Sequence, residues 1–258
     1  MTNKEIFDLI VSMGEVTLVN GGEISRTKET MDRAAETFGV KEFDAFIIAN
    51  GIFTSAVLDG QVYSSKILCV PLSPIYLCRV EAVNNLSREI VKGNASPEDA
   101  REQLNEIKTL TVVNNKAKLL ASGIGSACFC YLFGGSPLDS LVSFGAGILL
   151  YIFLLYVVPK ISLPKIMINI LGSALVTFYS CMVFTLGVGN NLDHIIIGSI
   201  ICLVPGVPLT NAIRNFFDDD YLSGMIRLMD AFLVAICIAT GVGLVLGLWS
   251  SFIGKGVV

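Results

Sequence analysis

The segment MIRLMDAFLVAICIATGVGLVLGLW (225–249) decides the fold class of this chain. It is apolar over a length that crosses the roughly 30 Å hydrocarbon core of a bilayer, as a helix that rises about 1.5 Å per residue. Only Arg227 and Asp230 interrupt it, and residues spaced i, i+3 share a helix face, so the two charges can neutralise each other. The segment predicts a transmembrane helix. It leaves open whether Asp230 is a structural partner of Arg227 or titrates within the membrane.

Four more apolar runs precede this segment. They are Ala117–Phe133, Leu141–Val158, Ile166–Val188 and Ile195–Phe217. The chain of 258 residues is 53% hydrophobic with a mean hydropathy of +0.70, which is too apolar for an ordinary globular protein. The sequence therefore predicts a multi-pass membrane protein in which residues 117–258 form an α-helical bundle of five transmembrane spans.

Charges in the loops between the runs predict the orientation. Basic residues gather in alternate loops: Lys116, Lys118, Lys160, Lys165, Arg214 and Arg227. The loops 134–140 and 189–194 contain no lysine or arginine. Because cytoplasmic loops carry the excess of basic residues, we expect the N-terminal part in the cytoplasm and the C-terminus outside.

The fourth run contains a break, CLVPGVPLTNAIRNFFDDDY (202–221). Two prolines around a glycine interrupt the helix, and a helix that restarts near Pro208 offers free N–H groups and the positive end of its dipole. Two neutral polar side chains and a cation follow, a combination that suits a carboxylate. The predicted binding residues are Pro205, Gly206, Pro208, Thr210, Asn211 and Arg214. The alternative is a proline-kinked helix whose polar residues lie at the membrane interface.

Residues 1–116 have the composition of a separate soluble domain. The stretch 1–118 holds 13 of the 18 Lys/Arg and 16 of the 22 Asp/Glu residues. Apolar periodicity predicts helices at 4–20, 24–38, 80–91 and 98–110, and short apolar runs predict strands at 44–49, 52–58 and 65–70. We expect a small cytoplasmic α/β domain, or an α+β domain, with its own core.

Several function classes find little support in the sequence. A net charge of −4 and a pI near 5.1 exclude nucleic-acid binding as the main activity. The seven cysteines form no C-x-x-C pair and are interpreted as reduced, buried residues, so no metal or other cofactor is expected. A membrane-anchored hydrolase would need Thr54 or Ser55 as nucleophile with Lys66 or Lys28 as base, because the single histidine, His194, lies in the apolar half.

Two segments in order resemble a known family. GGEISRTKETMDRAAETFG (21–39) and PGVPLTNAIRN (205–215), followed by DYLSGMIR (220–227), resemble the threonine/serine exporter family of bacterial inner-membrane proteins. The chain is most similar to the larger subunit of the split type, which works with a separate, smaller membrane subunit. The family's characteristic positions are occupied here by Glu23, Arg26, Glu29, Pro205, Gly206, Thr210, Asn211 and Arg214. Asn215 departs from the family pattern, in which an acidic residue often follows the arginine.

The resemblance implies export of threonine, serine or a small dicarboxylate, driven by an ion gradient, with Asp230 and Arg227 as candidate coupling residues. The odd number of predicted spans indicates a second subunit, because a five-span unit forms an inverted pair only with another odd-span unit. We therefore expect a smaller odd-span partner in the lipid bilayer and no enzymatic activity. The alternatives are the membrane-anchored hydrolase and a sensory or scaffold membrane protein.

Overall fold

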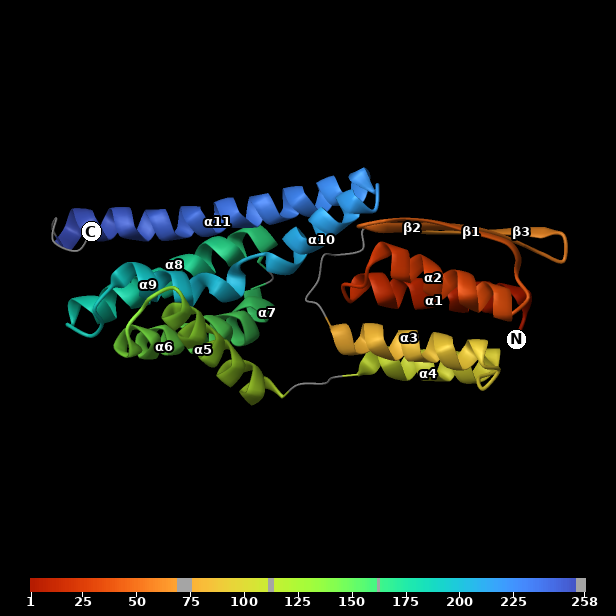
Figure 1. The fold of residues 1–258 in the computed structure, drawn as a ribbon, viewed down its shortest axis with the longest axis horizontal. Helices are drawn as coiled ribbons and strands as arrows, with labels where there is room; N and C mark the ends of the chain where they lie inside the picture. Colours follow the sequence, from red (N-terminus) through yellow and green to blue (C-terminus); the bar gives the residue numbers. More distant parts are fainter. Residues whose placement is uncertain (69–75, 111–113, 162, 254–258) are drawn as a thin grey trace. The chain divides into compact units, whose positions relative to one another are not determined.

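The computed structural model describes residues 1–68, 76–110, 114–161 and 163–253. They form two compact units, each described here by itself (Figure 1). The first unit comprises Met1–Val112 together with Asn211–Arg227, and the second comprises Val113–Thr210 together with Leu228–Val258. The predicted division near residue 116 cuts the chain once, whereas the contacts also group a later stretch, 211–227, with the N-terminal residues.

The N-terminal part of the first unit contains every predicted helix and strand. Its elements are α1 (Asn3–Val19), α2 (Ile24–Thr37), β1 (Lys41–Ile48), β2 (Gly51–Leu58), β3 (Gln61–Leu68), α3 (Leu77–Val91) and α4 (Pro97–Thr109). Local signals set their ends. Ser96 caps α4 by accepting the Asp99 N–H, with Pro97 in the first turn, as predicted. Gly39, with φ +72°, follows the end of α2. The last two residues of the third predicted strand, 69 and 70, lie outside the described residues.

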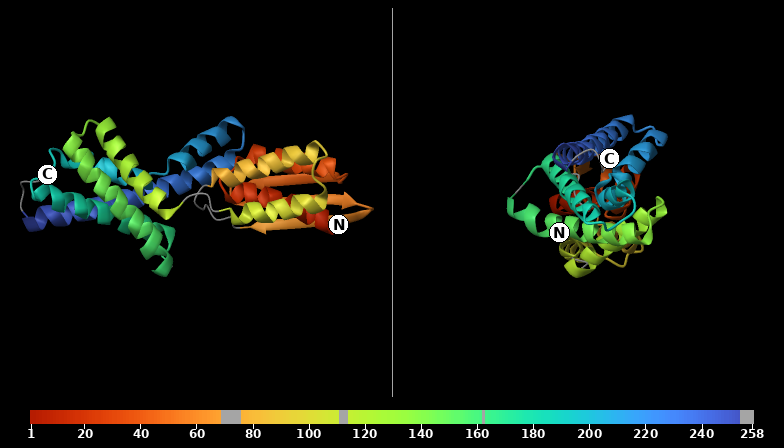
Figure 2. Two further views of the ribbon diagram at one scale, coloured as in Figure 1. Left: turned by 90° about the horizontal axis from the view of Figure 1, so that it is seen from below. Right: turned by 90° about the vertical axis from the view of Figure 1, so that its left-hand side faces the viewer.

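The sheet is an antiparallel meander in the order β1-β2-β3. The domain is therefore α+β, one of the two arrangements that the sequence allowed. Alternation along β2 turns Ile52, Thr54 and Ala56 inward and leaves Ser55 exposed on the other face. α1 and α2 cover the inner face, and α3 and α4 pack on these two helices as a further layer (Figures 1 and 2).

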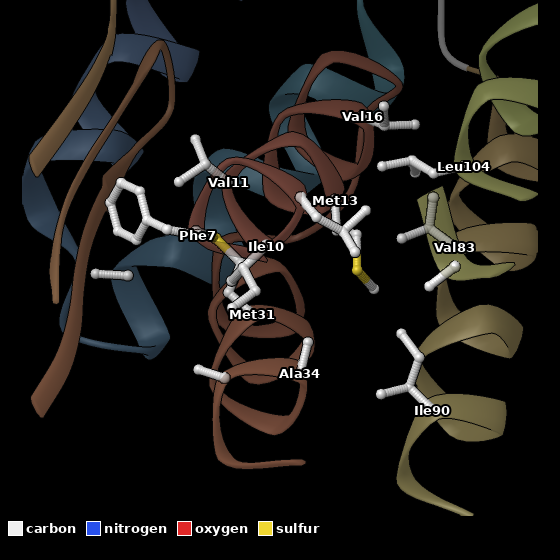
Figure 3. Close-up of a cluster of buried hydrophobic side chains, with 14 of the residues drawn as sticks. Phe7, Ile10, Val11, Met13, Val16, Met31, Ala34, Val83, Ile90 and Leu104 are labelled. Carbon is white, nitrogen blue, oxygen red and sulfur yellow. The ribbon is translucent and has the colours of Figure 1, made fainter. Parts of the chain in front are cut away.

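α1 contributes more residues to the core of this domain than any other element. Phe7, Ile10 and Met13 recur at helical spacing and are almost completely buried. Figure 3 shows Ile10 near Met31 of α2, Met13 toward Val83 of α3, and Phe7 on the other side, toward the strands. Fully burying side chains of this size stabilises a fold by about 1.5–3 kcal/mol each. This core lies within the first compact unit.

The second unit consists of helices. Its elements, including two that it shares with the first unit, are α5 (Asn115–Leu132), α6 (Pro137–Ile152), a π-helical turn (Phe153–Val157), α7 (Val158–Ile161), α8 (Lys165–Thr185), α9 (Leu192–Ile200), a 3-10 turn (Ile201–Leu203), α10 (Gly206–Phe217) and α11 (Tyr221–Ile253). The π-helical turn ends two residues before Pro159, which has no N–H to donate to the carbonyl of Leu155 within that turn.

Three of the described helices are long and apolar enough to cross a membrane: Pro137–Ile161, Lys165–Thr185 and Tyr221–Ser251. A fourth candidate is the bent pair Leu192–Leu203 and Gly206–Phe217, if the two halves form one span. α5 lies where the first span is predicted but is not among these candidates. The structure thus supports a multi-pass membrane protein, and the count of five spans stays a prediction.

Close packing in the second unit depends on glycines. A Cβ atom added to Gly147 would lie 2.4 Å from the Ser126 hydroxyl, and one added to Gly241 would lie 2.1 Å from the Ser173 hydroxyl. Helix backbones therefore approach closely here, as small residues permit in membranes. Gly243 and Gly247, which have the G-x-x-x-G spacing on α11, differ, because a Cβ atom added at either would meet nothing within 4 Å.

The cysteine prediction is correct only in part. Cys130, Cys181 and Cys237 are buried and free. Cys128 on α5 and Cys202 in the 3-10 turn are free but exposed, although the Cys202 Sγ atom lies 3.5 Å from the Ser122 hydroxyl. Cys69 lies outside the described residues.

Candidate functional site

The fourth apolar run is broken where the prolines predict. α9 passes through a 3-10 turn into extended backbone at Val204 (φ −62°, ψ 128°), and the chain turns by 63° before α10. The helix restarts at Gly206, earlier than the predicted Pro208. Pro205 lies directly before the restart. The residue before a proline disfavours helical backbone, so the preceding helix ends before Val204.

The early restart changes which donors are free. The Gly206 N–H bonds the Val204 carbonyl at 2.9 Å, and the Leu209 N–H bonds the Pro205 carbonyl at 3.1 Å. Pro208 has no N–H, which leaves the amide of Val207 as the open one in the first turn. The Thr210 hydroxyl donates to the carbonyls of its own helix, at 3.1 Å to Gly206 and 3.0 Å to Val207. The first turn of α10 therefore offers fewer donors than predicted.

Arg214 is paired with a residue of the segment 21–39, the first of the two segments that resemble the exporter family. Its guanidinium donates to the Glu23 carboxylate at 2.5 Å, within the first unit. Arg26 also pairs with this carboxylate, with 3.9 Å between Arg26 Nε and Glu23 Oε2. Glu23 immediately precedes α2 but makes no capping bond, because its carboxylate faces the two arginines. Glu29 is not part of this group and pairs with Arg33.

The structure buries Asn215, which follows Arg214 and was not assigned to a site, and Arg227, which was predicted as a candidate coupling residue. Asn215 on α10 is 8% exposed and Arg227 on α11 is 6% exposed. Within the described part of the chain, Asn215 Nδ2 and Arg227 Nε have no hydrogen-bond partner. Ser223, one turn before Arg227, is fully buried and its hydroxyl accepts the Ala49 N–H at 3.2 Å. A charged residue inside an apolar run was the signal available for Arg227.

Asp230 has a different partner from the one predicted. Both of its carboxylate oxygens accept from Lys165 Nζ at 2.7 Å. Arg227 makes no ion pair with it among the described residues. Lys165 begins α8 and lies far from Asp230 in sequence, so helical spacing could not indicate this pair.

Asp139 is a second carboxylate that the sequence did not single out. It is 1% exposed, and its oxygens accept backbone N–H groups from Ser136 at 2.8 Å, Asn190 at 2.6 Å and Asn191 at 3.2 Å. The capping-box spacing of Ser136 and Asp139 was the local signal. The bonds to 190 and 191 fix the loop before α9 to the start of α6.

The two candidate nucleophiles of the hydrolase alternative lie on opposite faces of the sheet, and the Lys66 side chain lies outside the described residues. Thr54 faces inward, buried, while Ser55 lies on the opposite face of the sheet. An open pocket of about 330 Å³ lies between α2 and β1, lined by Lys28, Asp32, Ala35, Glu36, Val40, Phe43 and Asp44. Burial raises the pKa of Asp32, Lys28 opposes this and Asp44 adds to it. The described residues contain no group of three or more metal-ligand side chains.

These features define a multi-pass membrane protein that carries an α+β domain and has a proline-broken helix pair among its apolar helices. The chain belongs to the ThrE family, described as "Putative threonine/serine exporter", whose match covers residues 8–249.

Two relatives are both named "Probable succinate transporter subunit YjjP". The one from Escherichia coli K12 is 22% identical over 248 residues, which cover 95% of this chain and 95% of that protein. The one from Klebsiella aerogenes is 21% identical over 249 residues, with the same coverage of both. No solved structure matches the chain.

Proposed function

We propose that this chain is the larger subunit of a secondary active exporter of small carboxylate-bearing metabolites. The substrate is threonine, serine or a dicarboxylate such as succinate, and the membrane is the bacterial inner membrane. One observation carries the proposal: in a chain of the exporter family, a broken helix pair is followed directly by Thr210, Asn211 and Arg214. Discontinuous helices of this kind form the substrate sites of many transporters.

The predicted site residues keep their roles in this proposal. Pro205, Gly206 and Pro208 create the break, and Arg214 supplies the charge for a carboxylate. The bond from Arg214 to the Glu23 carboxylate supports this chemistry, because this guanidinium already donates to a carboxylate. The pair is partly exposed, at 57% for Arg214 and 28% for Glu23, and such pairs contribute only about 0–1 kcal/mol. A substrate carboxylate can therefore compete with Glu23 at little cost.

Asp230 and Arg227 remain the candidate coupling residues. The Lys165–Asp230 ion pair stabilises the ionised carboxylate, so a coupling role for Asp230 requires that pair to open during transport. Arg227 has no such partner in the described chain, and its role is treated separately below.

A smaller, odd-span membrane subunit completes the exporter. With α5 included, the chain has five spans, residues 1–116 in the cytoplasm and the C-terminus outside. Both relatives are named as subunits, which supports a partner. The open glycines of α11, Gly243 and Gly247, support it as well, because a helix of another chain can approach the backbone there.

The test is transport by the complex. The chain and its smaller subunit are co-expressed, and everted vesicles are loaded by uptake of labelled succinate or threonine under an imposed ion gradient. We expect flux that needs both subunits and falls at least tenfold in Arg214→Gln. Arg101→Gln, which removes an exposed arginine from α4, is the matched control and should retain wild-type flux. The proposed function fails if wild-type vesicles move neither substrate.

A further inference from the structure

The hairpin of α10 and α11 buries two hydrogen-bond donors without acceptors. Asn215 and Arg227 are more than nine-tenths buried, and neither Asn215 Nδ2 nor Arg227 Nε has a partner among the residues described. A buried donor without an acceptor is costly in a folded protein, and most buried polar groups have a partner. The acceptor for these two donors therefore comes from outside the described residues.

The two donors belong to facing sides of the hairpin. On α10, Ala212 and Asn215 are the buried residues and share a helix face at i, i+3. On α11, Arg227 shares a face at i, i+3 with Gly224, whereas the Ser223 hydroxyl accepts the Ala49 N–H. The helices turn back on each other at the loop 218–220 (Figures 1 and 2), and Phe216 packs against Gly224. Asn215 directly precedes Phe216 and Arg227 lies three residues after Gly224, so both donors belong to helix faces that border the α10–α11 contact.

No carboxylate among the described residues forms an ion pair or hydrogen bond with the Arg227 guanidinium. Asp220 is the carboxylate whose charge acts on it. That carboxylate makes no hydrogen bond to Arg227 and instead accepts the Ser223 N–H at 3.1 Å, which caps α11. Ser223 in turn uses its hydroxyl to accept from Ala49. No carboxylate oxygen in the described hairpin fills the donor positions of Arg227 and Asn215.

We propose that Arg227 and Asn215 bind the carboxylate of the exported metabolite. This inference rests on the proposed function and adds to it the residues that hold the anion in the buried part of the hairpin. A guanidinium presents a planar fork of donors that matches a carboxylate in a bidentate way, and the amide of Asn215 adds a further donor. Arg214 lies on the exposed side of the same helix. It releases Glu23 and binds the carboxylate of the arriving metabolite, which then moves to Arg227 and Asn215.

The experiment measures succinate binding to the purified complex of the chain with its smaller subunit, by calorimetry in detergent. Arg227→Gln and Asn215→Ala each remove one donor, and we expect the Kd to rise about 10- to 100-fold for Arg227→Gln and severalfold for Asn215→Ala. Asn215→Asp places a carboxylate beside Arg227, and we expect a higher melting temperature without ligand together with loss of succinate binding. Arg101→Gln is the control with unchanged Kd, and succinamide, the uncharged analogue, should not bind to the wild-type complex.

The outcomes separate this inference from the proposed function. A wild-type Kd in both Arg227→Gln and Asn215→Ala, with succinate transport intact, overturns the assignment of the two donors and leaves the exporter function standing. Arg227→Gln can fail to fold; Asn215→Ala and Asn215→Asp then decide. A wild-type complex that neither binds nor moves succinate or threonine overturns the exporter function, and this inference with it.

Discussion

The glycines of α11 allow a sharp test of which helix surfaces are occupied within this chain. An alanine Cβ at Gly241 would lie 2.1 Å from Ser173 Oγ and 2.4 Å from the Ile170 carbonyl oxygen of α8. The second atom is backbone, so α8 and α11 must separate to admit it. Overpacking of this kind costs about 1–3 kcal/mol, and replacing a helical glycine by alanine returns about 0.5–1 kcal/mol. We expect Gly241→Ala to destabilise the chain by about 1–2 kcal/mol.

Gly243 and Gly247 should behave in the opposite way. No atom lies within 4 Å of a Cβ at either position, so alanine there gains only the backbone term, about 0.5–1 kcal/mol of stability. A leucine at either position also meets no atom of this chain near its Cβ, but it blocks the approach of a partner helix. Gly243→Leu and Gly247→Leu should therefore retain the melting temperature of the isolated chain and lose the partner.

Two measurements on the same variants check both halves of this reasoning. Thermal unfolding in detergent reports the stability of the chain, and co-purification of a tagged smaller subunit reports assembly. A Gly241→Ala protein as stable as wild type would refute the packing argument. Full recovery of the smaller subunit with Gly243→Leu and Gly247→Leu would show that the partner binds elsewhere.

Three further predictions follow from other parts of the chain. Asp139→Ala removes the acceptor of three backbone N–H groups, and it should lower the free energy of unfolding by about 3 kcal/mol or more, whereas Asp139→Asn should cost less; equal denaturation midpoints for Asp139→Ala and wild type would contradict this. Burial raises the pKa of Asp32 above its ordinary 3.8, so its contribution to stability is fully present below about pH 3.8 and is lost as the pH rises through the folded value. Asp32→Asn should therefore reduce the fall in melting temperature as the pH rises from about 3.8 through the folded pKa of Asp32. The same melting temperature profile in the variant and the wild type would contradict this role of Asp32. Ser251→Cys in a cysteine-free background should react with an impermeant thiol reagent added to intact cells, and protection would refute the five-span topology.

Much of the fold could be predicted because its causes are local. Apolar periodicity indicated the helices of the α+β domain, and Ser96 with Pro97 marked the start of α4. The break in the fourth apolar run was also predicted, because a proline acts on its own helix turn. Even there the restart at Gly206 came earlier than expected, since Pro208 fits within the first turn of a helix, where its missing N–H has no intrahelical acceptor.

The contacts of the candidate site were harder to predict because they join distant parts of the chain. Glu23 meets Arg214, and Lys165 meets Asp230, across separations that no helical or strand period encodes. The sequence paired Asp230 with Arg227 because they are neighbours on one helix face. The structure instead buries Arg227 on the inner side of a hairpin. That burial depends on where the chain turns back between the two helices. Local sequence patterns do not show which helix faces then meet.

The three bonds to Asp139 bear on how this protein can be engineered. Loops are usually the places that tolerate inserted tags or reporters. Here the loops 134–136 and 187–191 share one buried carboxylate, so an insertion in either would pull its N–H groups away from Asp139. The turn between α3 and α4 is the better place. Gly93 has φ +77° there with no atom within 4 Å of an added Cβ, and a fluorescent or affinity tag inserted after it leaves the membrane helices undisturbed.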